Sequence, residues 1–510
     1  MTKELSRRSF LGAVGAASVA SVATFAPVAS AASRAPEKWD ESVEFLVIGT
    51  GFAGLAAALE WHYLGNKDVL VVDKMPSAGG NSIINGGAVA AAGTDMQQKA
   101  GIKDNPDLLF SDIMRAGGGL AHPNLARRIA DESVPTYYWL RDEVGVKFKA
   151  VYLHGGHSVK RSHAVHDNRG SGFILPMLEK CKEFGIPVRL RTYVEELLTD
   201  ESGRVVGVKA RRNYRFGKEG SGKVITIQAR KGVLIAAGGF SQNVKMRMSH
   251  DPRLTAAFGS TNQPGATGEM IQEAQFLGAN TIQMDWIQLG PWTSPDEKGF
   301  GLAPLFVEPL VGYGPMVDGK TGKRFVKETG NRKVRADAIV AMGHPAVMYA
   351  KEEHVMRQVV GRNMTPEMFE RVVKNNVVRK FATLKELADF YGIDWNNLKA
   401  ENDKFNGYMR NKKDPEFDCM FFDDSTPNDK GPFYGVRLWP RVHHCMGGLE
   451  INENAEVLDA RGNVIPGLFA AGEATGGVHG MVRLGTVAVA DCLIFGRTAA
   501  RTASGKKAKK

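Results

Sequence analysis

Cysteine is scarce in this chain. Only Cys181, Cys419, Cys445 and Cys492 occur among 510 residues, and no C-x-x-C-H sequence is present. Cysteine ligands of a haem or a structural metal stand close together in sequence, whereas these four are widely separated. The pattern therefore gives no sign of attached haem and predicts no metal site. A disulfide would require an oxidising compartment.

Long apolar runs are also missing, with one exception near the N-terminus. Residues 12–26 are apolar but rich in Ala, Gly and Ser, and they fall short of the ~18 residues that a membrane-spanning helix needs. They follow Arg7 and Arg8 and precede Ala29-Ser30-Ala31. This order predicts a signal peptide over residues 1–31, cleaved near Ala31. The twin arginine indicates the Tat route, so we expect a periplasmic protein without a stable membrane anchor, an anchor being the less favoured alternative.

The chain lacks a strong excess of positive charge outside its termini. The formal net charge is +11, of which the signal region carries +2 and the basic tail over residues 504–510 carries +4. The remaining body, near +5, suits an acidic substrate or an acidic redox partner, and we expect no nucleic acid partner. The lysine-rich tail is expected to be disordered.

Glycine, by contrast, is placed in a pattern. An apolar run over residues 45–48 leads into Gly49, Gly51 and Gly54, then an apolar helix and a second apolar strand ending at Asp73. The first glycine permits a tight turn, the second lets a pyrophosphate approach the backbone, and the third lets the helix pack on the sheet. The helix N-terminus favours phosphate, and the acid can hold ribose hydroxyls. The pattern predicts a dinucleotide site in an α/β domain, the alternative being an ordinary βαβ turn.

Further glycine-rich turns follow apolar strands far along the chain. Residues 232–240 form one such strand and turn, and residues 466–477, which include Glu473, form another. Residues 79–93 are a third small-residue segment, suited to a loop close to a flavin ring. A helix is expected over residues 484–500. This recurrence favours FAD over NAD.

The character of the chain changes between residues 286 and 445. Residues 365–412 show helical periodicity with mixed charges. We therefore expect a second, mixed domain over 286–445, inserted into a discontinuous nucleotide-binding domain formed by 42–285 and 446–503.

Four segments carry a resemblance to a known family. They are Thr261-Asn262-Gln263-Pro264-Gly265-Ala266-Thr267-Gly268, Gly322-Lys323-Arg324-Phe325-Val326, Val442-His443-His444-Cys445-Met446-Gly447-Gly448-Leu449, and Ala471-Gly472-Glu473-Ala474-Thr475-Gly476-Gly477-Val478-His479-Gly480 with Arg483. Together they resemble the soluble, exported fumarate reductases and flavocytochrome c flavoproteins, with their urocanate and methacrylate-type relatives, from about residue 42 to about residue 503.

The resemblance implies a fold and a cofactor. The fold would be α/β, an FAD-binding dinucleotide (Rossmann-like) domain with an inserted α+β clamp (capping) domain, and FAD would be held non-covalently. The residues expected to bind it are Gly49, Gly51, Phe52, Ala53, Gly54, Asp73, Lys74, Gly80, Asn81, Ser82, Gly86, Gly87, Val194, Ala237, Gly238, Gly239, Gly268, Glu473, Ala488 and Val489.

The resemblance also implies catalytic roles for four residues. Arg332 matches the family's proton-donating arginine, Glu308 matches the glutamate of a proton relay, and His444 with Arg483 matches a carboxylate-binding pair. An arginine suits that last role because its planar fork binds a carboxylate through two hydrogen bonds. Taken alone, Arg332 would be a solvated side chain and His444 a packed one.

Three departures from the family pattern affect the far end of the substrate site and the proton relay. Gly290 stands where the family has a histidine for a second carboxylate, and Val307 replaces a threonine with the same task. Trp292 lies close by, and Val311 replaces the second arginine of the relay. Burying an unpaired carboxylate would cost several kcal/mol, so we expect a monocarboxylate substrate with an apolar or aromatic tail, and the relay is left incomplete.

These observations predict an exported FAD-dependent reductase of the C=C bond of an α,β-unsaturated carboxylate. The candidates are acrylate, methacrylate, cinnamate-like or urocanate-like acids, reduced in anaerobic respiration. Electrons would come from a separate donor, such as a periplasmic cytochrome c. The alternatives are a fumarate reductase with relocated ligands, a 3-ketosteroid dehydrogenase, and a non-catalytic electron-transfer flavoprotein.

Overall fold

The apolar residues 45–48, which precede Gly49, lie in the largest sheet of the protein. In the computed structural model, which describes residues 34–154, 156–166 and 168–506, this sheet has eight strands. The predicted signal peptide and the last four residues of the tail lie outside the described residues. The parallel strands run in the order β19 (Val464–Ala470), β9 (Lys223–Ile235), β1 (Glu41–Ile48), β2 (Val69–Val72) and β6 (Val188–Arg189).

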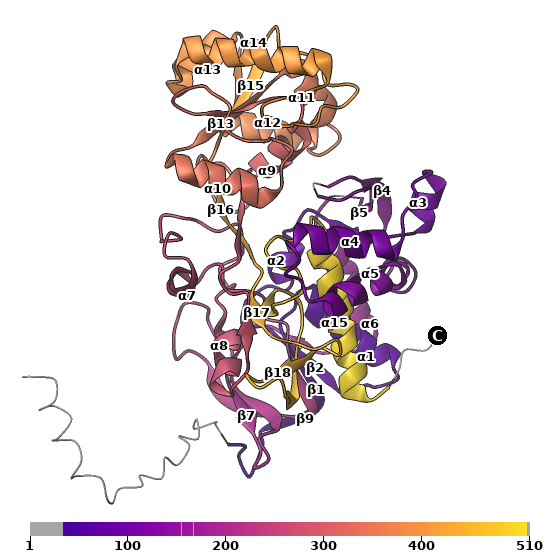
Figure 1. Ribbon diagram of the computed structural model, residues 1–510. Helices are drawn as coiled ribbons and strands as arrows, with labels where there is room; N and C mark the ends of the chain where they lie inside the picture. Colours follow the sequence, from indigo (N-terminus) through magenta and orange to yellow (C-terminus); the bar gives the residue numbers. More distant parts are fainter. Residues whose placement is uncertain (1–33, 155, 167, 507–510) are drawn as a thin grey trace, which may run out of the picture.

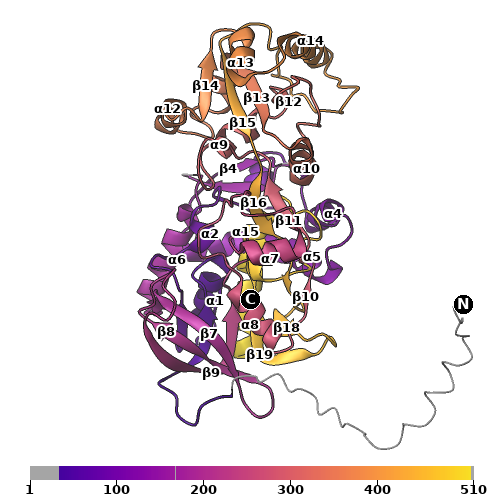
Figure 2. The same ribbon diagram turned by 90° about the vertical axis from the view of Figure 1, so that its left-hand side faces the viewer.

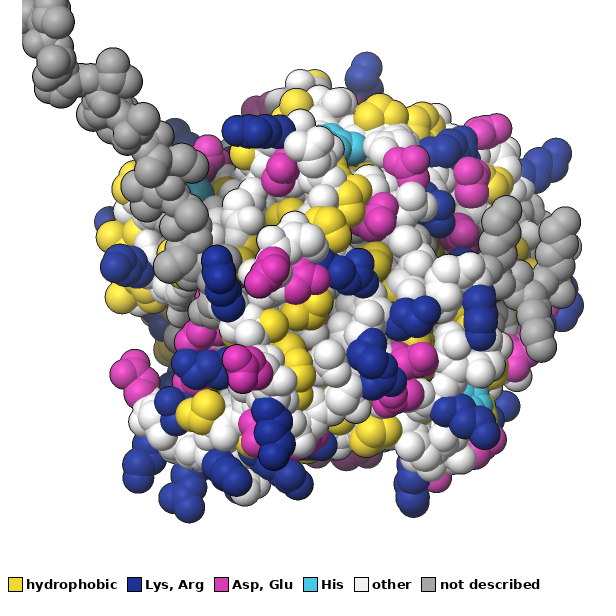
Figure 3. Space-filling view, turned by 90° about the horizontal axis from the view of Figure 1, so that it is seen from below, with side chains coloured by type: hydrophobic (Ala, Val, Ile, Leu, Met, Phe, Trp, Pro, Cys, Tyr) yellow, Lys and Arg dark blue, Asp and Glu magenta, His cyan; other side chains and the backbone are white. Residues whose placement is uncertain are grey.

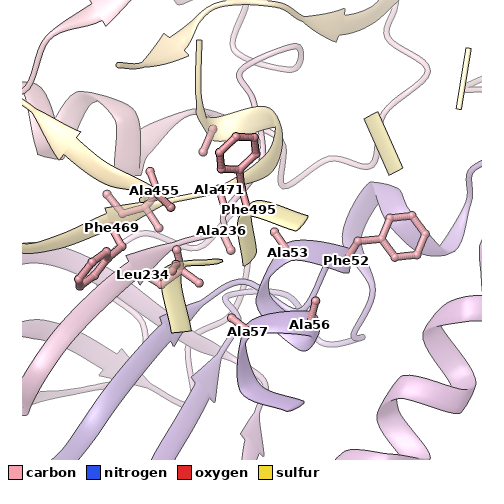
Figure 4. Packing of buried hydrophobic residues seen from close by; sticks show 14 of the residues in the cluster. Phe52, Ala53, Ala56, Ala57, Leu234, Ala236, Ala455, Phe469, Ala471 and Phe495 are labelled. Carbon is pink, nitrogen blue, oxygen red and sulfur yellow. The ribbon is translucent and has the colours of Figure 1, made fainter. Parts of the chain in front are cut away.

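Two helices far apart in the sequence cover one face of this sheet. They are α1 (Phe52–Tyr63) and α15 (Val487–Ser504), which pack against each other. Figure 4 shows the contact layer, where Ala53 and Ala57 of α1 lie near Leu234 of β9 and Phe495 of α15. All four side chains are almost fully buried. Such a two-layer core joins the N- and C-terminal parts of the nucleotide-binding domain.

Antiparallel strands extend the domain. β7 (Thr192–Thr199) and β8 (Val205–Arg212) form a hairpin on β9, and β18 (Glu456–Leu458) pairs with β19. A separate sheet has the order β3 (Ala88–Ala90), β5 (Ser162–Val165), β4 (Phe148–Tyr152), and β10 (Thr281–Ile282) pairs with β17 (Gly448–Leu449). The remaining helices of this part are α2 (Gly80–Ile83), α3 (Asp95–Lys99), α4 (Pro106–Ala116), α5 (Pro123–Tyr138), η1 (Trp139–Val144), α6 (Ser171–Glu183), α7 (Val244–His250), α8 (Glu269–Phe276) and η3 (Gly472–Ala474).

A second body with its own core sits above the first (Figures 1 and 2). Its antiparallel sheet has the order β12 (Met316–Asp318), β13 (Ala346–Lys351), β15 (Phe433–Leu438), β14 (Val378–Phe381). Its helices are α9 (Ala303–Val307), η2 (Glu308–Leu310), α10 (Arg332–Met342), α11 (Glu352–Gln358), α12 (Pro366–Lys374), α13 (Leu384–Tyr391) and α14 (Trp395–Asn411). We call this body the clamp. The α/β fold class is therefore confirmed.

Two strands connect the bodies. β11 (Ile287–Gly290) pairs antiparallel with β16 (Arg441–Cys445), and in Figure 2 the two strands lie side by side between the large sheet and the clamp. Gln288 is opposite His444, and Gly290 is opposite Arg441. This ladder therefore brings several of the predicted substrate-binding positions to the junction.

The described surface is mixed in charge. Seen from below, acidic and basic side chains are interspersed without a broad apolar patch on that face (Figure 3). Among residues 34–154, 156–166 and 168–506, no helix is both long and apolar enough to cross a membrane.

Candidate active site

A cavity opens where the parallel strands β1, β2, β9 and β19 end. Ligands of parallel sheets bind at this edge, and the glycine turns of the sequence meet there. Thirteen of the predicted cofactor residues line the cavity: Gly49, Gly51, Phe52, Ala53, Asp73, Lys74, Gly80, Asn81, Ser82, Val194, Ala237, Gly238 and Glu473. Residues from both halves of the discontinuous domain thus surround one elongated space suited to a dinucleotide.

The fingerprint glycines act as the sequence predicts. Gly49 has a φ of +116°, and a Cβ there would lie 2.2 Å from the carbonyl oxygen of Ala236. A Cβ on Gly54 would lie 2.0 Å from the carbonyl oxygen of Gly49. These two glycines therefore fit the turn and the helix to the strand, while Gly51 faces the cavity.

The polar groups of the cavity are partly engaged with the protein itself. Asp73 accepts hydrogen bonds from the backbone N–H and hydroxyl of Thr50 on one oxygen, and from the N–H of Met75 on the other. A carboxylate has about four acceptor positions, so one stays open for a ribose hydroxyl. Lys74 forms an ion pair with Glu269 at 2.8 Å.

Seven predicted cofactor residues do not line this cavity: Gly54, Gly86, Gly87, Gly239, Gly268, Ala488 and Val489. For some of them the structure gives another reason for a small residue. A Cβ on Gly239 would lie 2.8 Å from Oε1 of Glu473, and one on Gly87 would lie 2.2 Å from the backbone nitrogen of Arg169. Gly268 caps α8 with a φ of +74°. Ala488 and Val489 lie in the first turn of α15.

Glu473 lies between the cofactor cavity and the catalytic candidates. Its Oε1 accepts a hydrogen bond from the N–H of Cys445 at 3.0 Å and lies 3.7 Å from Nδ1 of His444. Burial raises the pKa of Glu473 to about 7. The residue therefore connects the cofactor cavity with strand β16.

The four catalytic candidates come from four separate segments of the chain. Arg332 is the first residue of α10, Glu308 begins η2, His444 lies on β16, and Arg483 lies in the turn before α15. Their charges act on one another: Arg332 lowers the pKa of Arg483, and Glu308 opposes the effect of burial on Arg332. The structure thus brings the four together at the junction of the clamp and the nucleotide-binding body, whereas their roles stay predictions.

The junction collects buried donors that have no partner. Nη1 of Arg332, Nε of Arg483 and Nε2 of Gln288 make no hydrogen bond among the described residues, nor do Nδ1 of His154 and Nε1 of Trp292. Within the described part of the chain, the acceptors of Arg483 are the carbonyl oxygen of Leu484 and, at 3.3 Å, the side-chain oxygen of Gln288. Unfilled buried donors of this kind cost about 1–3 kcal/mol each, so the site is built to receive an acceptor-rich anion.

The charge of the site leads to the same conclusion. Burial, followed by the effect of Arg332, lowers the pKa of Arg483 to about 9, so this guanidinium is still a cation at neutral pH. Burial and the nearby Arg483 hold the pKa of His444 well below its usual value, so its imidazole is neutral. Arg332 and Arg483 carry two positive charges against the ionised Glu308 and a Glu473 that is about half ionised at neutral pH, so the site keeps a net positive charge that favours a carboxylate.

Aromatic side chains lie beside Arg332, where the departures at Gly290 and Trp292 predict an apolar end of the substrate site. Trp292 is 2% exposed, its ring is 4.8 Å from that of His443, and it lies 5.4 Å from the guanidinium carbon of Arg332. A Cβ on Gly290 would lie 2.5 Å from the Trp292 ring. The indole thus fills the space of a side chain at position 290, and Val307 is fully buried in the clamp core.

Three residues of the site were not selected from the sequence as functional. They are His154, Gln288 and Arg335. Only Arg335 had a readable signal, because a residue three positions after Arg332 in a helix lies on the same face. His154 and Gln288 enter through loop and strand geometry that no local pattern encodes.

Comparison with known proteins agrees with this geometry. A family model described as "FAD binding domain" matches residues 44–489. The acrylate reductase flavoprotein subunit of Shewanella woodyi is 41% identical over 91% of this chain and 92% of that protein. The urocanate reductase of Eggerthella lenta is 34% identical over 92% of this chain and 76% of that protein.

A solved structure of a fumarate reductase has the same fold. The open conformation of a flavocytochrome c3 fumarate reductase matches with a TM-score of 0.74 and 31% identity, covering 91% of this chain and 78% of that one. The chain therefore belongs to the FAD-binding family of fumarate reductase-like flavoproteins, and it is an FAD-dependent reductase.

Proposed function

We propose that this protein reduces the C=C bond of a small α,β-unsaturated monocarboxylate, with acrylate as the simplest member of the class. The observation that carries the proposal is the group of unfilled donors on Arg332 and Arg483 beside the buried indole of Trp292. One end of the pocket is prepared for one carboxylate, and the other end is closed by an apolar ring. The similarity to an acrylate reductase flavoprotein subunit supports the same substrate class.

The side chains divide the work between binding and proton transfer. Arg483 and the neutral His444 hold the substrate carboxylate, which draws negative charge toward itself as the bond is reduced. When bound, reduced FAD supplies a hydride to the β-carbon. Arg332 then gives a proton to the α-carbon, and Glu308 lies where it can help to restore that proton.

The test is oxidation of a reduced viologen by the purified holoenzyme with a panel of enoates. We expect turnover with acrylate and methacrylate, and the saturated acid as product. Arg332→Ala should abolish turnover while FAD stays bound. The proposal fails if FAD is bound and no enoate accepts electrons, and retained activity in Arg332→Ala would remove that residue from the mechanism.

Fumarate reduction with relocated ligands is the rival activity. It would need a second carboxylate-binding site, but position 290, which the family uses for it, is Gly290, and the ring of Trp292 fills the space that a side chain there would need. A 3-ketosteroid dehydrogenase would have no use for a carboxylate pocket. Tyr349, a tyrosine of the insert, is fully buried in the clamp, where its hydroxyl donates to Asn402.

The proposed setting is the periplasm, with FAD held non-covalently and electrons delivered by a separate carrier such as a cytochrome c. The twin-arginine leader and the absence of a C-x-x-C-H sequence support this part of the proposal. Fractionation of cells with a tagged full-length chain tests the location. The route is wrong if replacing Arg7 and Arg8 by Lys leaves export unchanged.

A further inference from the structure

Glu308 meets an arginine that the family pattern does not supply. Position 311, where a second relay arginine is expected, is Val311, whose side chain packs against the apolar cluster of the clamp. Instead, Nη2 of Arg335 donates to Oε1 of Glu308 at 3.0 Å. The two residues reach the contact from different helices, α10 and η2.

The surroundings of Arg335 show that this contact dominates its environment. The residue is 4% exposed, and its Nε and Nη1 have no hydrogen-bond partner among the described residues. Glu308 is the one side chain that it is seen to bind. Burying a guanidinium costs free energy unless a carboxylate compensates its charge. The ion pair with Glu308 is therefore the interaction that stabilises the buried cation of Arg335.

The side chain of Glu308 is partly exposed at the junction. Its exposed fraction is 34%, and the charged or titratable groups that face it are Arg332 and Arg335 from α10 and His154 from the segment after β4. Desolvation alone would raise the pKa of Glu308, but Arg335 and then Arg332 outweigh it and hold the pKa below its usual value. Because Arg335 engages Oε1, the other oxygen stays open to accept a proton.

We infer that Arg335 is the second arginine of the proton path, a positioning residue that holds Glu308 ionised and oriented between solvent and Arg332. The inference rests on the proposed function. After Arg332 has given its proton to the α-carbon, Glu308 takes a proton from solvent on its free oxygen and passes it to Arg332. Arg335 stays a cation throughout and gains or loses no proton. The cycle is balanced by one solvent proton for each hydride transferred.

A matched pair of variants separates charge from packing. Arg335→Gln keeps a hydrogen-bond donor but removes the charge, and Arg335→Lys keeps the charge. We expect kcat for acrylate to fall about 10- to 100-fold in Arg335→Gln with KM nearly unchanged, as for loss of a general-acid path, and to recover largely in Arg335→Lys. Adding Val311→Arg to Arg335→Gln should restore part of the loss. In a Glu308→Gln background, Arg335→Gln should cause no further loss.

The protonation of Glu308 gives a readout that needs no substrate. The infrared band of the Glu308 carboxyl group is identified by its loss in Glu308→Gln. In the parent holoenzyme Glu308 should stay ionised, so this band should not change between pH 5 and 8. In Arg335→Gln the band should titrate at a higher pH than in the parent. Bound FAD, read from its visible absorbance, reports that each variant is folded. The inference is overturned if the parent turns over acrylate and Arg335→Gln matches it in kcat and pH profile, or if the carboxyl band titrates identically in both. If the parent reduces no enoate, the proposed function fails, and the infrared titration still decides the role of Arg335.

Discussion

At the scale of single residues, Gly290 and Trp292 together shape the expected substrate end of the site. Gly290 has no side chain, and the ring of Trp292 occupies the space that one would need. A polar ligand for a second carboxylate is thereby replaced by an indole that also lies over Arg332. We therefore expect this one aromatic residue to set the length of acid that fits and to cover Arg332.

Replacing that indole should change the choice of substrate. Trp292→Ala is expected to raise kcat/KM for cinnamate relative to acrylate by at least ~10-fold, because a misfit of this kind is worth about 1–3 kcal/mol. The measurement is viologen-coupled turnover with both acids on one preparation. Trp395→Ala, which removes a tryptophan from the outer part of the clamp, is the matched control. An unchanged ratio in Trp292→Ala would show that the indole does not bound the pocket.

Individual residues show both what the sequence could predict and what it could not. The roles of Gly49 and Gly54 followed from spacing, because local backbone geometry dictates them. The aromatic character of the far pocket followed from Gly290 and Trp292. The pairing of Arg335 with Glu308 did not, since two helices must dock before the residues meet. The unpartnered Nδ1 of His154 depends in the same way on the tertiary fold.

At the scale of elements, α1 contains Gly54 in its first turn, although glycine usually destabilises a helix. An alanine at Gly54 would ordinarily stabilise a helix by about 1 kcal/mol. Here its Cβ would meet backbone at 2.0 Å, which forces α1 away from β1 and the cofactor edge.

Gly54→Ala is therefore expected to weaken FAD retention at least ~10-fold and to lower the free energy of unfolding by about 1–3 kcal/mol. Flavin release during dialysis and denaturant unfolding measure the two effects. Gly407→Ala in α14 is the control, because nothing lies within 4 Å of a Cβ there and the change should be neutral or stabilising. Equal behaviour of the two variants would contradict the assigned role of Gly54.

The clamp shows where helical periodicity was insufficient. The expected helical region over residues 365–412 is divided into α12, α13 and α14, with β14 between the first two. Asn376 and Gly392 adopt positive φ angles of 59° and 71°, which end the preceding helical segments. Residues 378–381 then pair with β15, a long-range contact that sequence periodicity cannot reveal.

At the scale of the whole molecule, buried neutral histidines limit stability in acid. Burial lowers the pKa of His157, His163 and His354 to about 4. In the unfolded chain these groups take up protons near pH 6.5, so the unfolded state binds more protons at lower pH. Their contribution is complete above about pH 6.5 and is lost progressively as the pH falls toward 4.

The free energy of unfolding should therefore fall between pH 6.5 and 4, by up to about 3 kcal/mol for each of these histidines. Denaturant unfolding across that range measures the slope. His163→Gln should reduce the pH slope of the free energy of unfolding by the contribution of up to one proton. The neutral ring of His163 donates a hydrogen bond to the carbonyl oxygen of Arg161 and accepts one from the Thr94 hydroxyl at Nε2, and it can accept only while Nε2 carries no proton. A slope that is the same with and without His163 would contradict this account.

The central claim is that one end of the pocket holds a carboxylate and the other end excludes a second one. The most direct measurement is kcat/KM for acrylate and for fumarate, by reduced-viologen oxidation on one preparation of the holoenzyme. Burying an unpaired second carboxylate should cost several kcal/mol, so the account predicts a preference for acrylate of at least ~100-fold. Equal or better turnover of fumarate would contradict it.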